Sequence, residues 1–177
     1  MQTLQERVRE LIIDVPNFPI EGIVFKDILP IFRHSELVKE LITEMAKELQ
    51  PYHPTVIAGM ESRGFLLGLP LALELNVPFV CIRKKGKLPG EVSGISYSLE
   101  YGRAEIEIQK SALKAGDRVI LHDDVLATGG TANAAAQLIH SSGADLIAFS
   151  FLMELNFLKG REIIGLNNVA IHTFAQF

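Results

Sequence analysis

Residues 119–131 of the chain read VILHDDVLATGGT: an apolar run, then two adjacent aspartates, then a short loop of small residues. The apolar run 119–121 has the composition of a buried strand, and a helical pattern begins at Gly130 and extends to residue 142. In an open parallel sheet, ligands bind outside the carboxyl ends of the strands, where the chain turns into the next helix. The stretch therefore predicts a strand, a loop and a helix with a ligand site at their junction.

Two kinds of chemistry meet in this stretch. Gly129 and Gly130 let the backbone approach an anion closely, and the N–H groups at the start of the following helix favour a phosphate. Asp123 and Asp124 cannot bind that phosphate, but their oxygens suit ribose hydroxyls, or Mg²⁺ held through water. The alternative is a turn in which aspartate only caps the helix and glycine only serves the geometry, and for an isolated Gly-Gly pair this alternative is favoured. The two adjacent acids favour a sugar-phosphate site instead.

Short apolar runs alternate with helical segments over the rest of the chain from residue 55 onward. These segments are the apolar runs 56–58, 79–82, 145–153 and 169–174 and the helical segment 64–76. Buried apolar strands joined by crossover helices are typical of a parallel α/β sheet. We therefore expect a single α/β domain over residues 1–177, with an open, mostly parallel sheet flanked by helices.

The N-terminal part of the chain has a different pattern. Thr3 and Glu6 have the spacing of a capping box, and apolar residues then recur at helical intervals, so we expect a short N-terminal helix. Three prolines interrupt residues 15–32, which we expect to be irregular. An apolar stripe predicts a further helix over residues 35–49. Residues 1 to about 34 would form a small cap, or hood.

Residues 84–97 combine glycine, proline and lysine in a stretch that is too polar for the core and too long for a simple turn. Such a segment is typical of a flexible lid that closes over a bound ligand. Its lysines could equally be an ordinary solvated charge cluster.

Composition and charge limit the classes of function. The chain has 177 residues, of which 48% are hydrophobic and 21% charged, as expected for a folded globular protein. The net charge of −4 weighs against a nucleic-acid partner, although a small basic patch lies at residues 83–87. The apolar runs fall short of the roughly 20 residues that span a bilayer, and residues 1–10 do not resemble a secretory signal. We expect a cytoplasmic protein without a membrane partner, and a buried thiol at the single Cys81.

The run 119–131 resembles the phosphoribosyl pyrophosphate-binding signature of the type I phosphoribosyltransferases. Further motifs resemble the adenine-specific branch of this family and extend the resemblance over almost the whole chain. They are NFP (17–19) with GIVFKDI (22–28), ESRGF (61–65), RKKGKLPG (83–90), YSLEYG (97–102) and LKGRE (158–162). The resemblance implies purine salvage, in which the 5-phosphoribosyl group passes from phosphoribosyl pyrophosphate to adenine to give AMP and pyrophosphate. It also implies a homodimer, and Mg²⁺ as a cofactor held mainly by phosphoribosyl pyrophosphate and water, with no direct protein ligand.

The resemblance further assigns residues to each part of the substrate. The ribose and its 5′-phosphate would be bound by Asp123, Asp124, Ala127, Thr128, Gly129, Gly130 and Thr131. Pyrophosphate would be bound by Glu61, Ser62 and Arg63 on one loop and by Lys84, Lys87 and Tyr101 in or next to the lid. Arginine suits this role because its planar guanidinium group makes bidentate contacts to phosphate oxygens, although Arg63 could instead be a surface residue at a helix start. A cis peptide bond is implied between Glu61 and Ser62.

Adenine would lie against Val24, Phe25 and Leu155, although without the resemblance these residues are equally suited to a core. Backbone groups of Val24 and Lys26 would recognise the edge of the base, with the carbonyl accepting from the 6-amino group and the amide donating to N1. Hypoxanthine presents the opposite pattern at both positions. Each buried polar group left unpaired costs about 1–3 kcal/mol, so the discrimination would be strong.

Glu100 is implied to be the acid/base group that faces the imidazole ring of the purine, because adenine must present N9 as the nucleophile to C1′. An alternating strand could instead place Glu100 in solvent, and from the sequence alone that alternative is favoured. Three residues depart from the family pattern: Lys26 stands where arginine is common, Glu61 where aspartate is frequent, and His122 where an apolar residue is usual. We expect His122 to be a hydrogen-bonded strand residue and assign it no role.

Overall fold

A computed structural model of the chain describes residues 2–98, 103–165 and 168–177. The chain forms two compact units, Met1–Met45 and Ala46–Phe177. The expected cap lies within the first unit, while its boundary near residue 34 and the single-domain organisation stay predictions.

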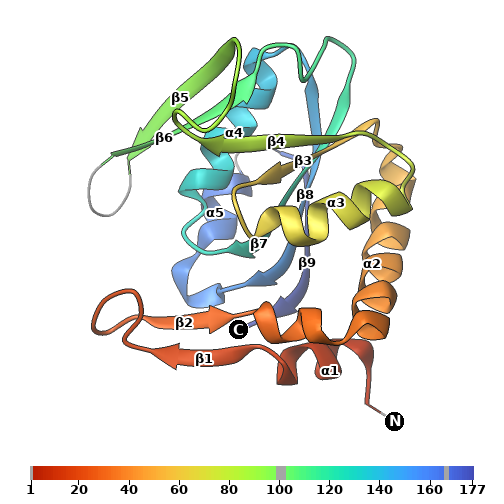
Figure 1. The fold of residues 1–177 in the computed structure, drawn as a ribbon, viewed down its shortest axis with the longest axis vertical. Helices are drawn as coiled ribbons and strands as arrows, with labels where there is room; N and C mark the ends of the chain where they lie inside the picture. The colour runs from red at the N-terminus through yellow and green to blue at the C-terminus, as the bar shows by residue number, and fades with distance from the viewer. Residues whose placement is uncertain (1, 99–102, 166–167) are drawn as a thin grey trace. The chain divides into compact units, whose positions relative to one another are not determined.

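The first unit begins with the short helix that the sequence predicts, α1 (Leu4–Glu10). Its capping box is confirmed, because Thr3 Oγ1 accepts a hydrogen bond from the Glu6 amide at 3.2 Å while Glu6 Oε2 accepts one from the Thr3 amide at 2.7 Å. Helix α2 (Ser35–Leu49) also occupies the expected residues and continues into the second unit (Figure 1).

The expectation of an irregular segment over residues 15–32 is wrong in part. Strands β1 (Ile13–Pro16) and β2 (Val24–Asp27) pair in an antiparallel hairpin, and a short 3₁₀ helix, η1 (Leu29–Arg33), follows. Pro16 is the last residue of its strand, where a missing N–H group interrupts no interior rung of the ladder. Proline therefore marks the end of the pairing here and does not prevent it.

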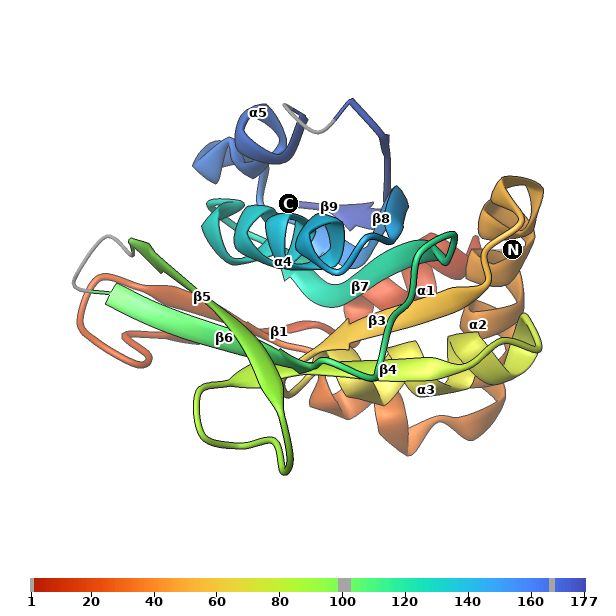
Figure 2. The ribbon, with the colours of Figure 1, turned by 90° about the horizontal axis from the view of Figure 1, so that it is seen from above.

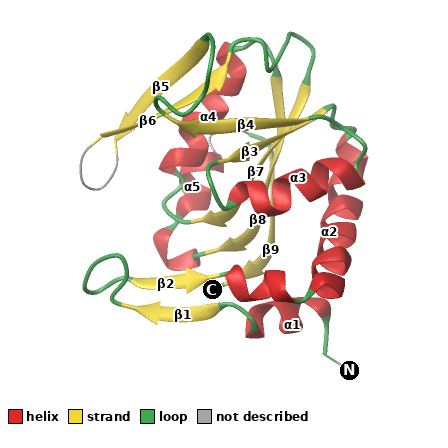
Figure 3. Ribbon diagram, viewed as in Figure 1, coloured by secondary structure: helices red, strands yellow, loops and turns green. Residues whose placement is uncertain are grey.

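The second unit contains, in the part of the chain that the structure describes, a seven-stranded sheet of order β5-β6-β4-β3-β7-β8-β9. The strands are β3 (Val56–Met60), β4 (Phe79–Lys84), β5 (Val92–Ser98), β6 (Arg103–Gln109), β7 (Arg118–Leu126), β8 (Asp145–Glu154) and β9 (Ala170–Gln176). The strands from β4 to β9 in this order are parallel, while β5 and β6 pair antiparallel with each other and β6 pairs antiparallel with β4. The expected open, mostly parallel sheet is confirmed (Figure 3).

Helices cover both faces of this sheet, as expected. Helix α3 (Gly64–Glu74) lies on one face and α4 (Gly130–Ser141) on the other (Figure 2). The small 3₁₀ helices η2 (Gln50–Tyr52) and η3 (Asn156–Leu158) and the short helix α5 (Gly160–Ile164) complete the unit. None of the helices in the described ranges is both long and apolar enough to cross a membrane.

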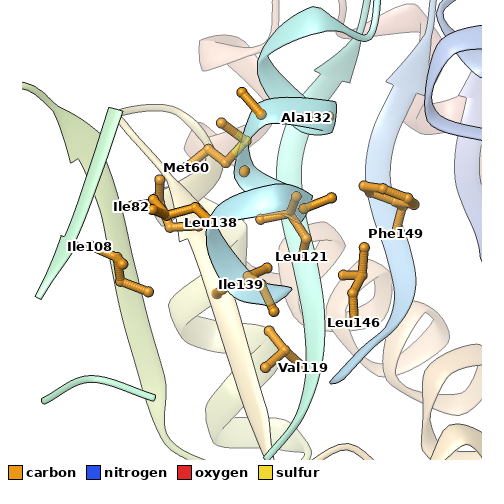
Figure 4. Close-up of a cluster of buried hydrophobic side chains, with 14 of the residues drawn as sticks. Met60, Ile82, Ile108, Val119, Leu121, Ala132, Leu138, Ile139, Leu146 and Phe149 are labelled. Atoms are coloured by element: carbon orange, nitrogen blue, oxygen red, sulfur yellow. The ribbon is translucent and has the colours of Figure 1, made fainter. Parts of the chain in front are cut away.

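The core between α4 and the sheet fixes the position of β7 and its loop. Leu138 and Ile139 of α4 pack with Val119 and Leu121 of β7 and with Phe149 of β8 (Figure 4). All five side chains are essentially excluded from water. Burial of such side chains contributes roughly 1.5–3 kcal/mol each. The packing against α4 therefore fixes the position of the strand that carries the two aspartates.

The expected lid differs from the structure in its second half. Residues 92–97 belong to β5 and pair with β6, so that Val92 lies opposite Gln109 and Tyr97 opposite Ala104. Valine, isoleucine and tyrosine in this segment favour a strand despite Gly94, and the lysines and the other glycines that suggest a loop lie within residues 84–90. Cys81 on β4 is a free thiol, as expected, but it is only half-buried, where a buried thiol was expected.

Candidate active site

The strand, loop and helix that the sequence predicts around residues 119–142 are present, with the loop at the carboxyl end of β7. The strand continues through both aspartates to Leu126, five residues beyond the apolar run that predicted it. Residues 127–129 then turn into α4, which begins at Gly130. Gly129 has a φ of +81°, a left-handed conformation that glycine adopts without strain. It also has no side chain to cap α4, so the helix start presents N–H groups without a capping oxygen from that residue.

The second predicted loop, residues 61–63, joins β3 to α3 at the same edge of the sheet. Strands β3 and β7 are parallel neighbours, with Gly59 opposite His122, so both loops leave the sheet side by side. The implied cis peptide bond between Glu61 and Ser62 is present. Gly64 lies so close to β7 that an added Cβ would be 2.8 Å from Asp123 Oδ1.

An ion pair joins the loop at 61–63 to the end of β7. Arg63 Nε lies 2.9 Å from Asp124 Oδ2, and the Asp124 side chain is only 4% exposed. Asp123 Oδ1 in turn accepts a hydrogen bond from the Asp124 amide at 2.9 Å. The structure therefore brings together two acids and one arginine that sequence analysis assigned to separate parts of a substrate.

Burial sets the protonation of the two acids. Removal from water raises the pKa of Asp123 well above its usual range, and the neighbouring carboxylate of Asp124 raises it further. Burial also raises the pKa of Asp124, while Arg63 opposes the rise. Burial and the neighbouring acid disfavour the charged form of this pair, and groups that donate hydrogen bonds or carry positive charge, as Arg63 does, stabilise the ionised form.

His122 lies directly before this pair and is fully buried. Its Nδ1 is 3.2 Å from Ser150 Oγ, and among the described residues Nε2 has no hydrogen-bond partner. Burial lowers the pKa of His122 to about 4. The expectation of a hydrogen-bonded strand residue is confirmed for one ring nitrogen, and the ring is neutral near pH 7.

The Glu61 side chain is engaged at the base of the expected lid. It accepts hydrogen bonds from the Arg83 guanidinium group, at 3.0 Å and 3.3 Å, and from the Lys84 amide at 2.9 Å. Arg83 also donates to the Lys87 carbonyl at 2.9 Å. The hydrogen bond from Arg83 lowers the pKa of Glu61. Sequence analysis gave Arg83 no role of its own, although the motif at 83–90 contained it.

The remaining predicted site residues fall into three groups. Val24, Phe25 and Lys26 are on β2 in the first unit, where Lys26 Nζ lies 2.6 Å from Asp14 Oδ1. Leu155 follows β8 in the second unit, and its amide donates to the Leu126 carbonyl at 2.9 Å, next to the loop at 127–129. Glu100 and Tyr101 lie outside the described residues.

Comparison with known proteins defines the class. Residues 26–161 match the phosphoribosyl transferase domain family. An adenine phosphoribosyltransferase from Cytophaga hutchinsonii is 45% identical over 161 residues, which cover 91% of this chain and 89% of that protein.

Solved structures agree in fold. The crystal structure of adenine phosphoribosyltransferase from Saccharomyces cerevisiae, in complex with an imino-altritol bisphosphate and adenine, has a TM-score of 0.91 at 44% identity and covers 97% of this chain and 98% of that chain. The enzyme from Thermoanaerobacter pseudethanolicus has a TM-score of 0.94 at 43% identity, with 99% and 100% covered. The fold is thus that of a phosphoribosyltransferase. Within that class, the chain belongs to the adenine phosphoribosyltransferase family.

The buried His122 should make stability depend on pH. The unfolded chain binds a proton on this histidine below about pH 6.5, but the folded chain does not until about pH 4. The free energy of unfolding should therefore fall by about 2 kcal/mol from this group between pH 7 and pH 5. Urea denaturation gives the change in the free energy of unfolding between pH 7 and pH 5 for the wild type and for His122→Leu, and the difference between these two changes is the contribution of His122. The raised pKa values of the aspartate pair favour the folded state at low pH, which is the opposite effect. Because both proteins contain this pair, its effect largely cancels in the difference.

His140, which is exposed on α4, provides the matched control. His140→Gln should keep the pH dependence of the wild type. A His122→Leu protein whose unfolding free energy changes with pH as much as that of the wild type would show that the folded state protonates His122 normally.

Proposed function

We propose that this chain transfers the 5-phosphoribosyl group of phosphoribosyl pyrophosphate to adenine, giving AMP and pyrophosphate in purine salvage. The observation that carries the proposal is the ion pair of Arg63 with Asp124, which joins the loop at 61–63 to the end of β7, just before the loop at 127–129. Two anion-binding loops with acids between them match a substrate that has phosphate at both ends of a ribose. Similarity to adenine phosphoribosyltransferases supports adenine as the base.

The loop after β7 would hold the ribose 5′-phosphate. Backbone N–H groups of residues 127–131 and the start of α4 favour an anion, and the Thr128 and Thr131 hydroxyl groups add donors. Asp123 and Asp124 would accept hydrogen bonds from the ribose hydroxyls. Their negative charge would also favour the positive charge that develops on the ribose as its bond to pyrophosphate breaks.

The loop after β3 would hold the departing pyrophosphate. Ser62 and Arg63 would donate to its oxygens, with Glu61 contributing through its backbone, since its carboxylate is bound by Arg83. Lys84, Lys87 and Tyr101 would add to the site as the lid closes. Exclusion of water matters here, because the activated ribose would otherwise be hydrolysed.

Magnesium would be coordinated mainly by oxygen atoms of the substrate, with the protein contributing few ligands. Within the described ranges, no group of three or more His, Cys, Asp or Glu side chains is arranged to hold a metal ion. The Asp123 and Asp124 carboxylates offer the hard oxygen atoms that Mg²⁺ accepts, directly or through water. When bound with the substrate, the ion would offset the negative charge that grows on pyrophosphate.

Val24, Phe25 and Leu155 would contact the faces of adenine, while backbone groups of Val24 and Lys26 would recognise its edge. Glu100 would exchange the proton of the purine imidazole ring as N9 attacks C1′. We place the protein in the cytoplasm and expect small molecules, not nucleic acids or membranes, as its ligands. The net charge of −4 supports this choice.

A second copy of the chain is the partner that we propose for helix α3. Residues 64–73 read GFLLGLPLAL and contain no charged side chain. Leu66, Leu69 and Leu73 are nevertheless 41%, 47% and 71% exposed. A helix that is apolar on all sides is normally buried on all sides, and such a face on a soluble protein commonly meets another subunit. This stripe of leucines supports a homodimer.

Substrate competition tests the proposed activity. With Mg²⁺ and phosphoribosyl pyrophosphate, adenine should release pyrophosphate and form AMP, while hypoxanthine and guanine should react at least about a hundredfold less efficiently. The physical reason is that both edge contacts are mismatched for a 6-oxopurine. Measurement of kcat/KM for each base decides the matter, and comparable turnover of hypoxanthine would contradict adenine specificity.

Glu100→Gln tests the proposed proton transfer. Glutamine keeps the size of the side chain but cannot exchange a proton, so the single-turnover rate should fall by about 10²–10⁴. The affinity for adenine should change much less. Glu36→Gln, on an exposed glutamate of α2 that pairs with Lys39, is the matched control and should keep the wild-type rate. A Glu100→Gln protein with an unchanged single-turnover rate would place this residue outside the chemistry.

Leu69→Glu tests the proposed subunit contact. A charge in the middle of the leucine stripe should convert the dimer to a monomer, because an unpaired charge at an apolar interface is strongly unfavourable. Sedimentation velocity gives the mass in solution. Phe157→Glu, at a side chain that is 71% exposed but outside the stripe, should remain dimeric. A dimeric Leu69→Glu protein, or a monomeric wild type, would contradict this assignment.

A further inference from the structure

A buried glutamate and an arginine form an ion pair behind the phosphate loop, in the LKGRE motif to which no role has been assigned. The Arg161 guanidinium group meets both carboxylate oxygens of Glu154, with Nη2 to Oε2 at 2.6 Å and Nε to Oε1 at 3.1 Å. Glu154 is the last residue of β8 and is 3% exposed. A buried carboxylate with a bidentate arginine partner is among the stronger polar contacts in proteins.

Arg161 also reaches the neighbouring strand. Its Nη1 donates to the Ile171 carbonyl at 3.3 Å and its Nη2 to Thr173 Oγ1 at 3.4 Å, both on β9. The arginine is the second residue of α5, which has only five residues and lies beside α4 (Figure 2). A helix of this length is not stable by itself, so its place is set by tertiary contacts. The contacts of Arg161 with β8 and β9 therefore anchor α5.

The first residue of α5 lies directly against the phosphate loop. A Cβ added to Gly160 would collide with the carbonyl oxygen of Ala127, and one added to Gly129 would lie 2.6 Å from the carbonyl oxygen of Gly160. The two backbones thus touch with no space for a side chain on either glycine. Because the contact is this close, a shift of α5 cannot occur without a change in the loop.

The same ion pair is also connected to the start of the loop. Glu154 lies opposite Leu126, the last residue of β7, and the Leu155 amide donates to the Leu126 carbonyl at 2.9 Å. The pairing of β7 with β8 therefore fixes the start of the loop at 127–129, and the contact with Gly160 of α5 restricts the rest of it. The ion pair of Arg161 with Glu154 connects α5 to the end of β8.

We propose that Arg161 and Glu154 are positioning residues for the 5′-phosphate, acting through α5 on residues 127–129. This inference rests on the proposed function of that loop. The pair does not touch the substrate in this arrangement, and its effect is to keep the backbone N–H groups of the loop aimed at one point. A misplacement of about 1 Å at a substrate-positioning site can lower the reaction rate about a hundredfold.

The test compares two ligands that would occupy different parts of the site. AMP carries the 5′-phosphate, whereas magnesium pyrophosphate would occupy only the loop at 61–63. Arg161→Lys keeps the charge but loses the planar fork. In case a buried, poorly paired Glu154 prevents that variant from folding, the double variant Glu154→Gln/Arg161→Gln removes both charges. Glu162→Gln, on the same helix in an exposed pair with Lys159, is the matched control.

Isothermal titration at one temperature gives the dissociation constants. In each folded variant, AMP should bind about 10- to 100-fold more weakly, while pyrophosphate binding should stay within about twofold of the wild type. The Glu162→Gln control should bind both ligands as the wild type does. Unchanged AMP affinity in a folded variant would overturn the inference. Equal losses for AMP and pyrophosphate would also overturn it, since they would indicate a general structural role.

Binding of AMP and adenosine to the wild-type protein distinguishes a failure of this inference from a failure of the proposed function. If residues 127–131 bind the 5′-phosphate, wild-type protein should bind AMP much more tightly than adenosine. Equal affinities would reject the phosphate site itself. A clear preference for AMP, together with variants that retain it, would reject only the role of Arg161 and Glu154.

Discussion

Asp123 and Asp124 take two adjacent carboxyl groups largely out of water near the end of β7. Such a pair is stable only if the surrounding groups compensate for the lost hydration. Arg63 supplies the positive charge, and the Asp124 amide supplies a hydrogen bond to its neighbour. Because Arg63 belongs to the loop after β3, its ion pair with Asp124 joins residues that are 61 positions apart in sequence. Helix α3 must also begin with a residue as small as Gly64 to leave space for Asp123.

The sheet order makes this arrangement possible. Strands β3 and β7 are parallel neighbours, so their loops emerge at one edge, and the following helices α3 and α4 lie on opposite faces. Each helix start faces the edge with its positive dipole end. The acids stand between two regions that favour anions. This alternation of charge along one edge suits a sugar with phosphate on both sides better than it suits a single phosphate or a metal ion alone.

The sequence predicted those features that depend on neighbouring residues. The buried strands, α3, α4 and the loop at 127–129 follow from apolar runs and small residues that occur together in the chain. The hairpin of β1 and β2 was missed because prolines suggested a break, and β5 was missed because its flanking glycines and lysines suggested a lid. The pairs Glu61 with Arg83 and Glu154 with Arg161 could not be predicted, because each joins residues from different elements and only the tertiary fold places them in contact.

In the basic cluster at residues 83–87, such contacts distinguish cations that have carboxylate partners from cations that do not. Arg83 is bound by Glu61, and Lys85 Nζ lies 2.8 Å from Glu105 Oε2, which raises the pKa of Lys85. Both cations thus already have carboxylate partners within the fold, while Lys84 and Lys87 are exposed. An incoming anion would have to compete with the carboxylates of Glu61 and Glu105 for the first two. Lys84 and Lys87 form no ion pair within the described residues, although Lys84 lies in the field of Glu61. Equal charges along a short sequence therefore become unequal in the structure. Lys85 is exposed but paired with Glu105, and the exposed lysines without such a pair among the described residues, Lys84 and Lys87, are those that the proposed pyrophosphate site requires.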